Sequence, residues 1–99
     1  MARKRVDRSS KNLEDLPNVG RSVAEDLRSI GIATPADLRD CDAFELYEKI
    51  AQVTGQRHDP CLLDTFMSAI DFVNGNPARP WWHYTTQRKT EMARRANMS

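Results

Sequence analysis

The residues of this chain best suited to binding chemistry form a short turn, Pro17-Asn18-Val19-Gly20-Arg21-Ser22. Pro17 ends the helical pattern before it, and Asn18 and Gly20 both tolerate left-handed backbone, so the chain can reverse within a few residues. An amphipathic helix follows, and its first backbone N–H groups lie at the positive end of the helix dipole. Such groups bind a phosphate oxygen without reading a base. We therefore expect residues 17–22, called the 17–22 turn below, to contact a nucleic-acid backbone. The alternative is a purely structural connector.

Histidine and cysteine side chains form the second candidate group. His58 and Cys61 lie close in sequence, and Cys41 and His83 are the residues that would complete a zinc site. The paired ligand spacing of zinc sites is missing, however, and the Asp-Pro pair before Cys61 is more simply a helix start. A thiol there has a lowered pKa and can act as a nucleophile, but no third orienting group is identifiable. We predict no metal, no cofactor, no catalytic residue and no enzymatic activity.

Aromatic and cationic side chains gather in the segment Ala78-Arg79-Pro80-Trp81-Trp82-His83-Tyr84-Thr85. Interleaved aromatic and basic residues are suited to stacking on unpaired bases and to phosphate contact. The competing interpretation is that the tryptophans fold back over the core of a small domain. We expect at least one of the two tryptophans to cover the core.

Length and composition restrict the class of protein. A chain of 99 residues with 39% hydrophobic and 29% charged residues is typical of one folded domain. No apolar run approaches the roughly 18 residues that span a membrane, and no apolar stretch follows the basic start as in a secretory signal. We therefore expect a cytoplasmic protein with reduced cysteines, no membrane partner and no small-molecule substrate.

Charge is strongly segregated although the net charge is only +1. Residues 1–11 carry +4, residues 12–78 carry −7 and residues 79–99 carry +4. Basic segments commonly follow nucleic-acid backbone, but they can equally bind the acidic body of the same molecule or of a neighbour in a dimer. We divide the chain into a flexible basic arm (1–11), a helical domain (12–84) and a basic tail (85–99) that is partly flexible or helical.

Apolar spacing and helix-capping residues predict an all-α fold, a compact bundle of about five helices. The expected helices cover residues 11–16, 17–30 with the turn included, 35–40, 43–54 and 60–73. Thr34, Asp42 and Asp59 precede three of these helices as caps, and Gly31 and Gly55 follow two of them. Residues 85–96 are polar but compatible with a helix.

The 17–22 turn resembles the helix-hairpin-helix motif, a binder of DNA backbone that does not read sequence. One departure is Asn18, which stands where that motif usually has a glycine. Three blocks, at 15–20, 55–61 and 80–84, occur in this order in the pathogenicity-locus family of small bacterial helix-hairpin-helix proteins, sometimes labelled mitomycin-resistance proteins. This chain resembles that family over about residues 12–89. The stretch from the turn to Leu38 is also similar to the C-terminal domains of the bacterial RNA polymerase α subunit and of the DNA-uptake regulator family.

The resemblance implies a helical module that contacts double-stranded DNA rather than an enzyme. Carried over residue by residue, it places the phosphate contacts at Pro17, Asn18, Val19, Gly20, Arg21 and Ser22. The alternative function is a protein-interaction or self-associating helical module, as a homodimer or with a protein partner, in which the turn is architectural. The acidic centre, with Glu25 and Asp26 on the helix after the turn, favours this alternative.

Overall fold

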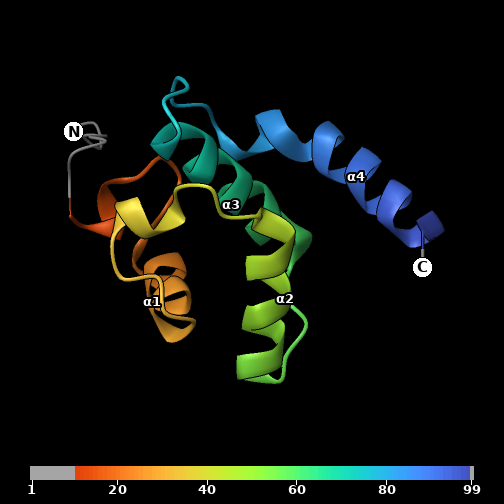
Figure 1. Cartoon of the computed structure of the whole chain (residues 1–99), viewed down its shortest axis with the longest axis horizontal. Helices are drawn as coiled ribbons and strands as arrows, with labels where there is room; N and C mark the ends of the chain where they lie inside the picture. The colour runs from red at the N-terminus through yellow and green to blue at the C-terminus, as the bar shows by residue number, and fades with distance from the viewer. Residues whose placement is uncertain (1–10, 99) are drawn as a thin grey trace.

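The computed structural model describes residues 11–98, and this part of the chain is helical, with no strand (Figure 1). Its elements are η1 (Leu13–Asp15), α1 (Arg21–Ser29), η2 (Pro35–Leu38), α2 (Ala43–Thr54), α3 (Pro60–Val73), η3 (Trp81–Tyr84) and α4 (Thr85–Met98), where η marks a short 3-10 helix. Almost all of the predicted basic arm, residues 1–10, lies outside the described residues. The all-α prediction is confirmed for the part of the chain that the structure describes.

The expected number and type of helices are only partly confirmed. The helices predicted at 17–30 (turn included), 43–54 and 60–73 are α1, α2 and α3, and the first of them begins only at Arg21. Those predicted at 11–16 and 35–40 are single 3-10 turns. The structure therefore has a 3-10 turn, not an α-helix, before the 17–22 turn, and a complete helix-hairpin-helix is not confirmed. The polar stretch after residue 84, which was predicted to be compatible with a helix, forms α4.

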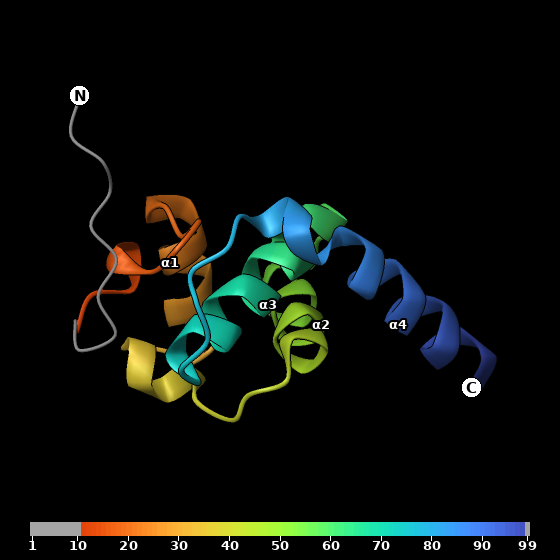
Figure 2. The ribbon, with the colours of Figure 1, turned by 90° about the horizontal axis from the view of Figure 1, so that it is seen from above.

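Helix α3 lies at the centre of the fold, with α1, α2 and α4 arranged around it (Figures 1 and 2). Leu63, Phe66, Ile70 and Val73 are its buried apolar face, as the helical spacing predicts. Residues from the other elements complete the core, namely Leu13, Leu16, Val19, Ala24, Leu27, Ile32, Leu38, Leu46 and Ile50.

Helices η2, α2 and α3 begin at acidic or hydroxyl caps, as expected. The Asp42 carboxylate accepts a hydrogen bond from the Phe44 backbone N–H at 2.9 Å, and Asp59 accepts one from the Cys61 N–H at 2.8 Å. At the start of η2, Asp37 Oδ2 accepts the backbone N–H of Thr34 at 3.0 Å. These contacts satisfy N–H groups that have no partner within their own helix.

Helix α4 is held to the body by a buried ion pair that sequence analysis missed. Asp64 on α3 is fully buried, and its Oδ1 lies 2.9 Å from Nε of Arg88, whose side chain is 11% exposed. The Thr85 hydroxyl donates to the other Asp64 oxygen at 2.8 Å. Further along α4, Arg95 lies 3.2 Å from Asp42 Oδ2. Among the alternatives for the basic C-terminal segment, these contacts favour binding to the acidic body of the same molecule.

No helix among residues 11–98 combines the length and apolar character needed to cross a bilayer.

Candidate nucleic-acid interface

The 17–22 turn reverses the chain at Asn18, not at Gly20. Asn18 has a φ of 64°, in the left-handed region, whereas Gly20 has a φ of −95° and a ψ of −173°, which any residue can adopt. The expectation that Gly20 supplies a left-handed conformation is therefore wrong. Val19 is fully buried and anchors the turn in the core.

The Asn18 side chain has a structural role that explains why asparagine stands at this position. Its amide nitrogen donates to Ser68 Oγ at 2.9 Å and to the Arg79 carbonyl at 2.8 Å. Ser68, which is buried on α3, donates to the same carbonyl at 2.8 Å. Asparagine thus combines left-handed backbone with two contacts that a glycine cannot make. The turn is tied both to α3 and to the segment before η3.

The start of α1 is left open. Gly20 is its N-cap, no side chain caps the helix, and its first turn holds no acidic residue. The first helical hydrogen bond runs from Ala24 N–H to Gly20 C=O at 3.0 Å, so the N–H groups of Arg21, Ser22 and Val23 have no partner within the helix. Among the residues that the structure describes, none has an atom within 4 Å of a Cβ built on Gly20. The space in front of these N–H groups is therefore open.

Three charged side chains of α1, Arg21, Glu25 and Arg28, form ion pairs within α1 or with η1. Arg21 lies 3.3 Å from Glu25, and both are exposed, at 88% and 62% of their side-chain surface. A pair this exposed is weak, so Arg21 can exchange Glu25 for another anion. Arg28 instead forms a two-point contact with Glu14, at 2.8 and 3.2 Å, which raises the pKa of Arg28. Arg21 is therefore the cation of α1 nearest to the open start.

Many acidic side chains of the centre, whose formal charge is −7, have partners within the molecule. At least seven of its twelve acidic side chains have partners within the molecule, namely Glu14, Glu25, Asp37, Asp42, Asp59, Asp64 and Asp71. Two of the seven, Asp42 and Asp64, meet arginines of α4, so the basic C-terminal segment neutralises part of the body. The charge that the folded chain presents to a ligand therefore depends on which side chains are paired, not on the formal charge of each segment.

The expectation that a tryptophan covers the core is wrong. Trp81 and Trp82 are 37% and 65% exposed, and Tyr84 instead is buried, at 4%. The Tyr84 hydroxyl donates to Asp71 Oδ2 at 2.6 Å, and burial together with this bond raises the pKa of Tyr84. Tyr84 can take the buried position because its polar end finds a partner there.

Comparison of this sequence with known proteins identifies its family. The pathogenicity locus family matches residues 6–90, which is most of the chain. The chain belongs to the pathogenicity locus family. It is also 58% identical over 82 residues to a protein of Streptomyces lavendulae named mitomycin resistance protein McrB, a match that covers 83% of this chain and 78% of that relative. No solved structure matches.

The His58–Cys61 segment of this pathogenicity locus protein is held by structural contacts. His58 Nε2 lies 2.9 Å from Thr54 Oγ1, and the His58 carbonyl accepts a hydrogen bond from the Tyr47 hydroxyl. The expected lowering of the Cys61 pKa is wrong, because hydrogen bonding to the Asp59 carboxylate and burial both raise it. Both cysteines are free thiols. Within residues 11–98, no three metal-binding side chains are placed to share an ion.

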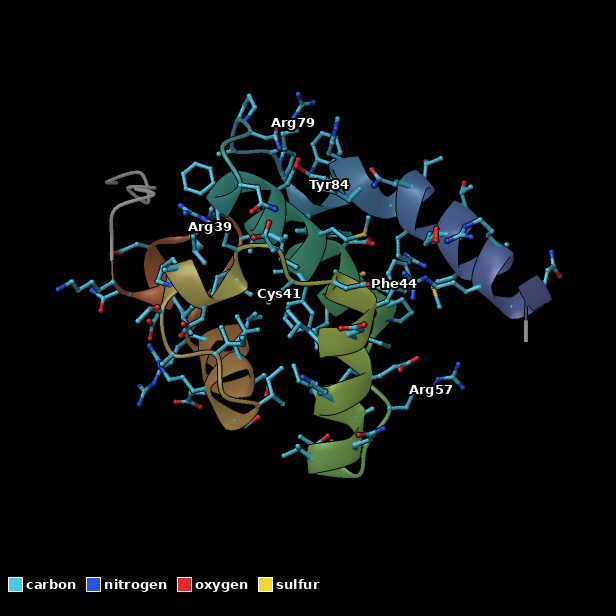
Figure 3. All side chains as sticks on the ribbon, viewed as in Figure 1. Arg39, Cys41, Phe44, Arg57, Arg79 and Tyr84 are labelled. Carbon is cyan, nitrogen blue, oxygen red and sulfur yellow. The ribbon has the colours of Figure 1, made fainter. Side chains whose placement is uncertain are left out.

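A groove of about 730 Å³ lies on another face, among the start of α2, α3 and α4. Cys41, Phe44 and Tyr84 are among its lining residues and are labelled in Figure 3. The Arg95 guanidinium lies 4.2 Å from the centre of the Phe44 ring and pairs with Asp42 at the edge of the groove. The lining of the groove thus combines apolar side chains with polar ones and with the paired charges of Asp42, Glu91 and Arg95. This groove was not predictable from the sequence, because nothing in the sequence indicated that α4 packs here.

Proposed function

We propose that this protein binds the backbone of double-stranded DNA through the 17–22 turn, without reading sequence and without catalysis. The observation that carries this proposal is the open start of α1. Three N–H groups lack helical partners, the first turn has no acid, and the space above Gly20 is empty. A phosphate oxygen satisfies such N–H groups and interacts favourably with the helix dipole.

The side chains of the turn support the same proposal. Val19 and Asn18 anchor the turn to the core and to α3, so the N–H groups are held in position before a ligand arrives. Arg21 adds an exposed positive charge whose present partner, Glu25, is exposed as well. Binding based on phosphate contacts alone tolerates any sequence and weakens steeply with salt.

Gly20→Asp tests the proposal because it moves stability and binding in opposite directions. The new carboxylate caps α1 and meets the helix dipole favourably, so we expect the melting temperature to rise by a few degrees. The same carboxylate occupies the phosphate position, so we expect affinity for a duplex DNA to fall about ten-fold or more. Fluorescence anisotropy with a labelled duplex at two salt concentrations measures the binding.

Two matched variants make the result specific. Gly20→Asn adds a side chain of the same size without charge and should lose less affinity than Gly20→Asp. Gln52→Glu adds the same charge on the exposed surface of α2 and should leave affinity within about two-fold. The proposal fails if the natural protein does not bind duplex DNA at low salt, or if Gly20→Asp binds as well as the natural protein.

The groove among α2, α3 and α4 favours a second candidate, a protein-interaction or self-associating module with an architectural turn. Phe44, Met67 and Ile70 give this groove apolar surface that a helix of another chain can cover. Sedimentation velocity separates the two candidates. A stable dimer whose mass does not change when duplex DNA is added supports the second candidate. Its Gly20 variants should then be unaffected by the DNA as well.

A further inference from the structure

Trp82 exposes an aromatic surface that the fold does not use, and Trp81 beside it is 37% exposed. They are the only tryptophans in the chain, and Trp82 leaves 65% of its surface in water. Proline at position 80 precedes them, and the 3-10 turn η3 continues directly into α4, so their backbone is held on both sides. Exposing a rigidly held aromatic residue has no benefit for stability, and such surfaces commonly mark a binding site.

This aromatic surface lies beside the 17–22 turn. The Arg79 carbonyl accepts hydrogen bonds from Asn18 of the turn, at 2.8 Å, and from Ser68. Trp81 and Trp82 follow two and three residues later, so their Cα atoms lie within about 11 Å of the Arg79 Cα. Figure 2 shows the segment that leads to η3 running over α3 on the side of α1. A nucleic-acid strand that continues past the turn can therefore reach the tryptophans.

The charges of the two segments suit the same ligand. Residues 17–22 and 76–83 together carry two arginines and no acidic side chain, in contrast to the acidic centre as a whole. Arg79 lies against His83, with Nη1 3.1 Å from Nε2, so it is held near the tryptophans. Aromatic rings flanked by cations form the stacking surfaces of proteins that bind single-stranded nucleic acid.

We propose that this face takes DNA in which unpaired bases adjoin a duplex. The turn binds backbone phosphates of the duplex, and Trp81 and Trp82 stack on the unpaired bases next to it. This inference rests on the proposed function and names its substrate class. Bases inside a duplex are already stacked on each other, so only an overhang, gap or frayed end presents the faces that tryptophan can cover.

Tryptophan fluorescence and a pair of DNA ligands test the inference. All tryptophan emission of the protein comes from these two residues, so stacking on a base should quench it directly. We expect a duplex with a short single-stranded overhang, on either the 5′ or the 3′ end, to bind about five-fold or more tightly than the blunt duplex. We also expect it to quench the emission, which the blunt duplex leaves nearly unchanged.

Three variants isolate the tryptophan contribution. Trp82→Ala should bind the overhang duplex only as well as the blunt one, and its fold should persist because the residue is mostly exposed. Trp82→Phe retains a ring and should keep most of the preference. Val53→Ala removes another exposed apolar residue, on α2, and should change neither affinity.

The outcomes separate the two proposals. Equal affinity for blunt and overhang duplexes, with no quenching, overturns the inference and leaves backbone binding by the turn intact. Failure to bind either DNA overturns both. A Trp82→Ala protein with unchanged preference for the overhang but altered sedimentation also overturns the inference, because the tryptophans then belong to a protein interface.

Discussion

The 17–22 turn and helix α4 both carry basic residues, but the two regions use positive charge differently. The C-terminal segment has the larger formal charge, +4, yet Arg88 is buried against Asp64 and Arg95 is paired with Asp42. The turn has one arginine, but its N–H groups and the space above Gly20 are open. Whether a basic residue is available to bind a ligand therefore depends on how it packs, not on the formal charge of its segment.

The physical reason is the cost of an unpaired charge away from water. Asp64 is fully buried, so the fold must supply a cation, and α4 supplies it. No such demand exists at the start of α1, where N–H groups can be hydrated until an anion replaces the water. The most basic part of the described chain thus serves the fold, and a nearly neutral turn remains free to bind.

Asp64→Asn should produce the largest effect, because it breaks the contact that makes α4 part of the body. Removing one partner of a buried pair leaves the other charge uncompensated, so we expect a loss of about 3 kcal/mol in the free energy of unfolding. For a chain of this size this corresponds to a drop of more than about 10 °C in melting temperature. Chemical denaturation and circular dichroism measure both.

Glu91→Gln is the matched control for that variant. It makes the same carboxylate-to-amide change in an ion pair with Arg94 and Arg95 at the surface of α4, where pairing contributes little. Similar stability losses in the two variants would contradict the buried role of Asp64.

Arg21→Gln and Arg95→Gln compare the two regions directly in DNA binding. Arg21→Gln should weaken duplex binding a few-fold and reduce the slope of log K against log salt by about 0.9, the value for one phosphate contact. Arg95→Gln should leave that slope unchanged, because its guanidinium is held by Asp42 and the Phe44 ring. If Arg95→Gln has the larger effect, α4 and not the turn is the DNA contact.

Asp59→Ala removes the side chain that caps α3, a helix start that is capped where that of α1 is not. We expect the smallest effect from this variant. Loss of the cap of α3 should lower the melting temperature by about 4 °C at pH 7. The hydrogen bond from the Cys61 backbone N–H lowers the pKa of Asp59 from its ordinary value of 3.8, so the contribution exists above pH 3.8 and is lost as pH falls further. Melting curves should therefore converge below that pH. A difference that persists at pH 2 would show that ionised Asp59 is not the cause.

Local features of the fold were predictable because they depend on neighbours in sequence. Asp42 and Asp59 cap α2 and α3, Val19 is buried, and α3 presents the expected apolar face. The 3-10 turns at η1 and η2 were predicted as longer helices because a cap and a proline mark where a helix starts, not how far packing allows it to continue. Gly20 was assigned the conformation that Asn18 adopts, because both residue types tolerate it.

The sequence by itself determined the all-helical class, the family blocks, the helix starts and the turn at 17–22, since capping chemistry and apolar spacing act over a few residues. Only the tertiary structure decided which groups remain available. It buried Tyr84 in place of the tryptophans, paired α4 with Asp64, and joined Asn18 to the Arg79 carbonyl across 61 positions of the chain. Burial and ion pairing depend on contacts between distant segments of the chain. These contacts decide whether a basic residue is free to bind a ligand or only stabilises the fold.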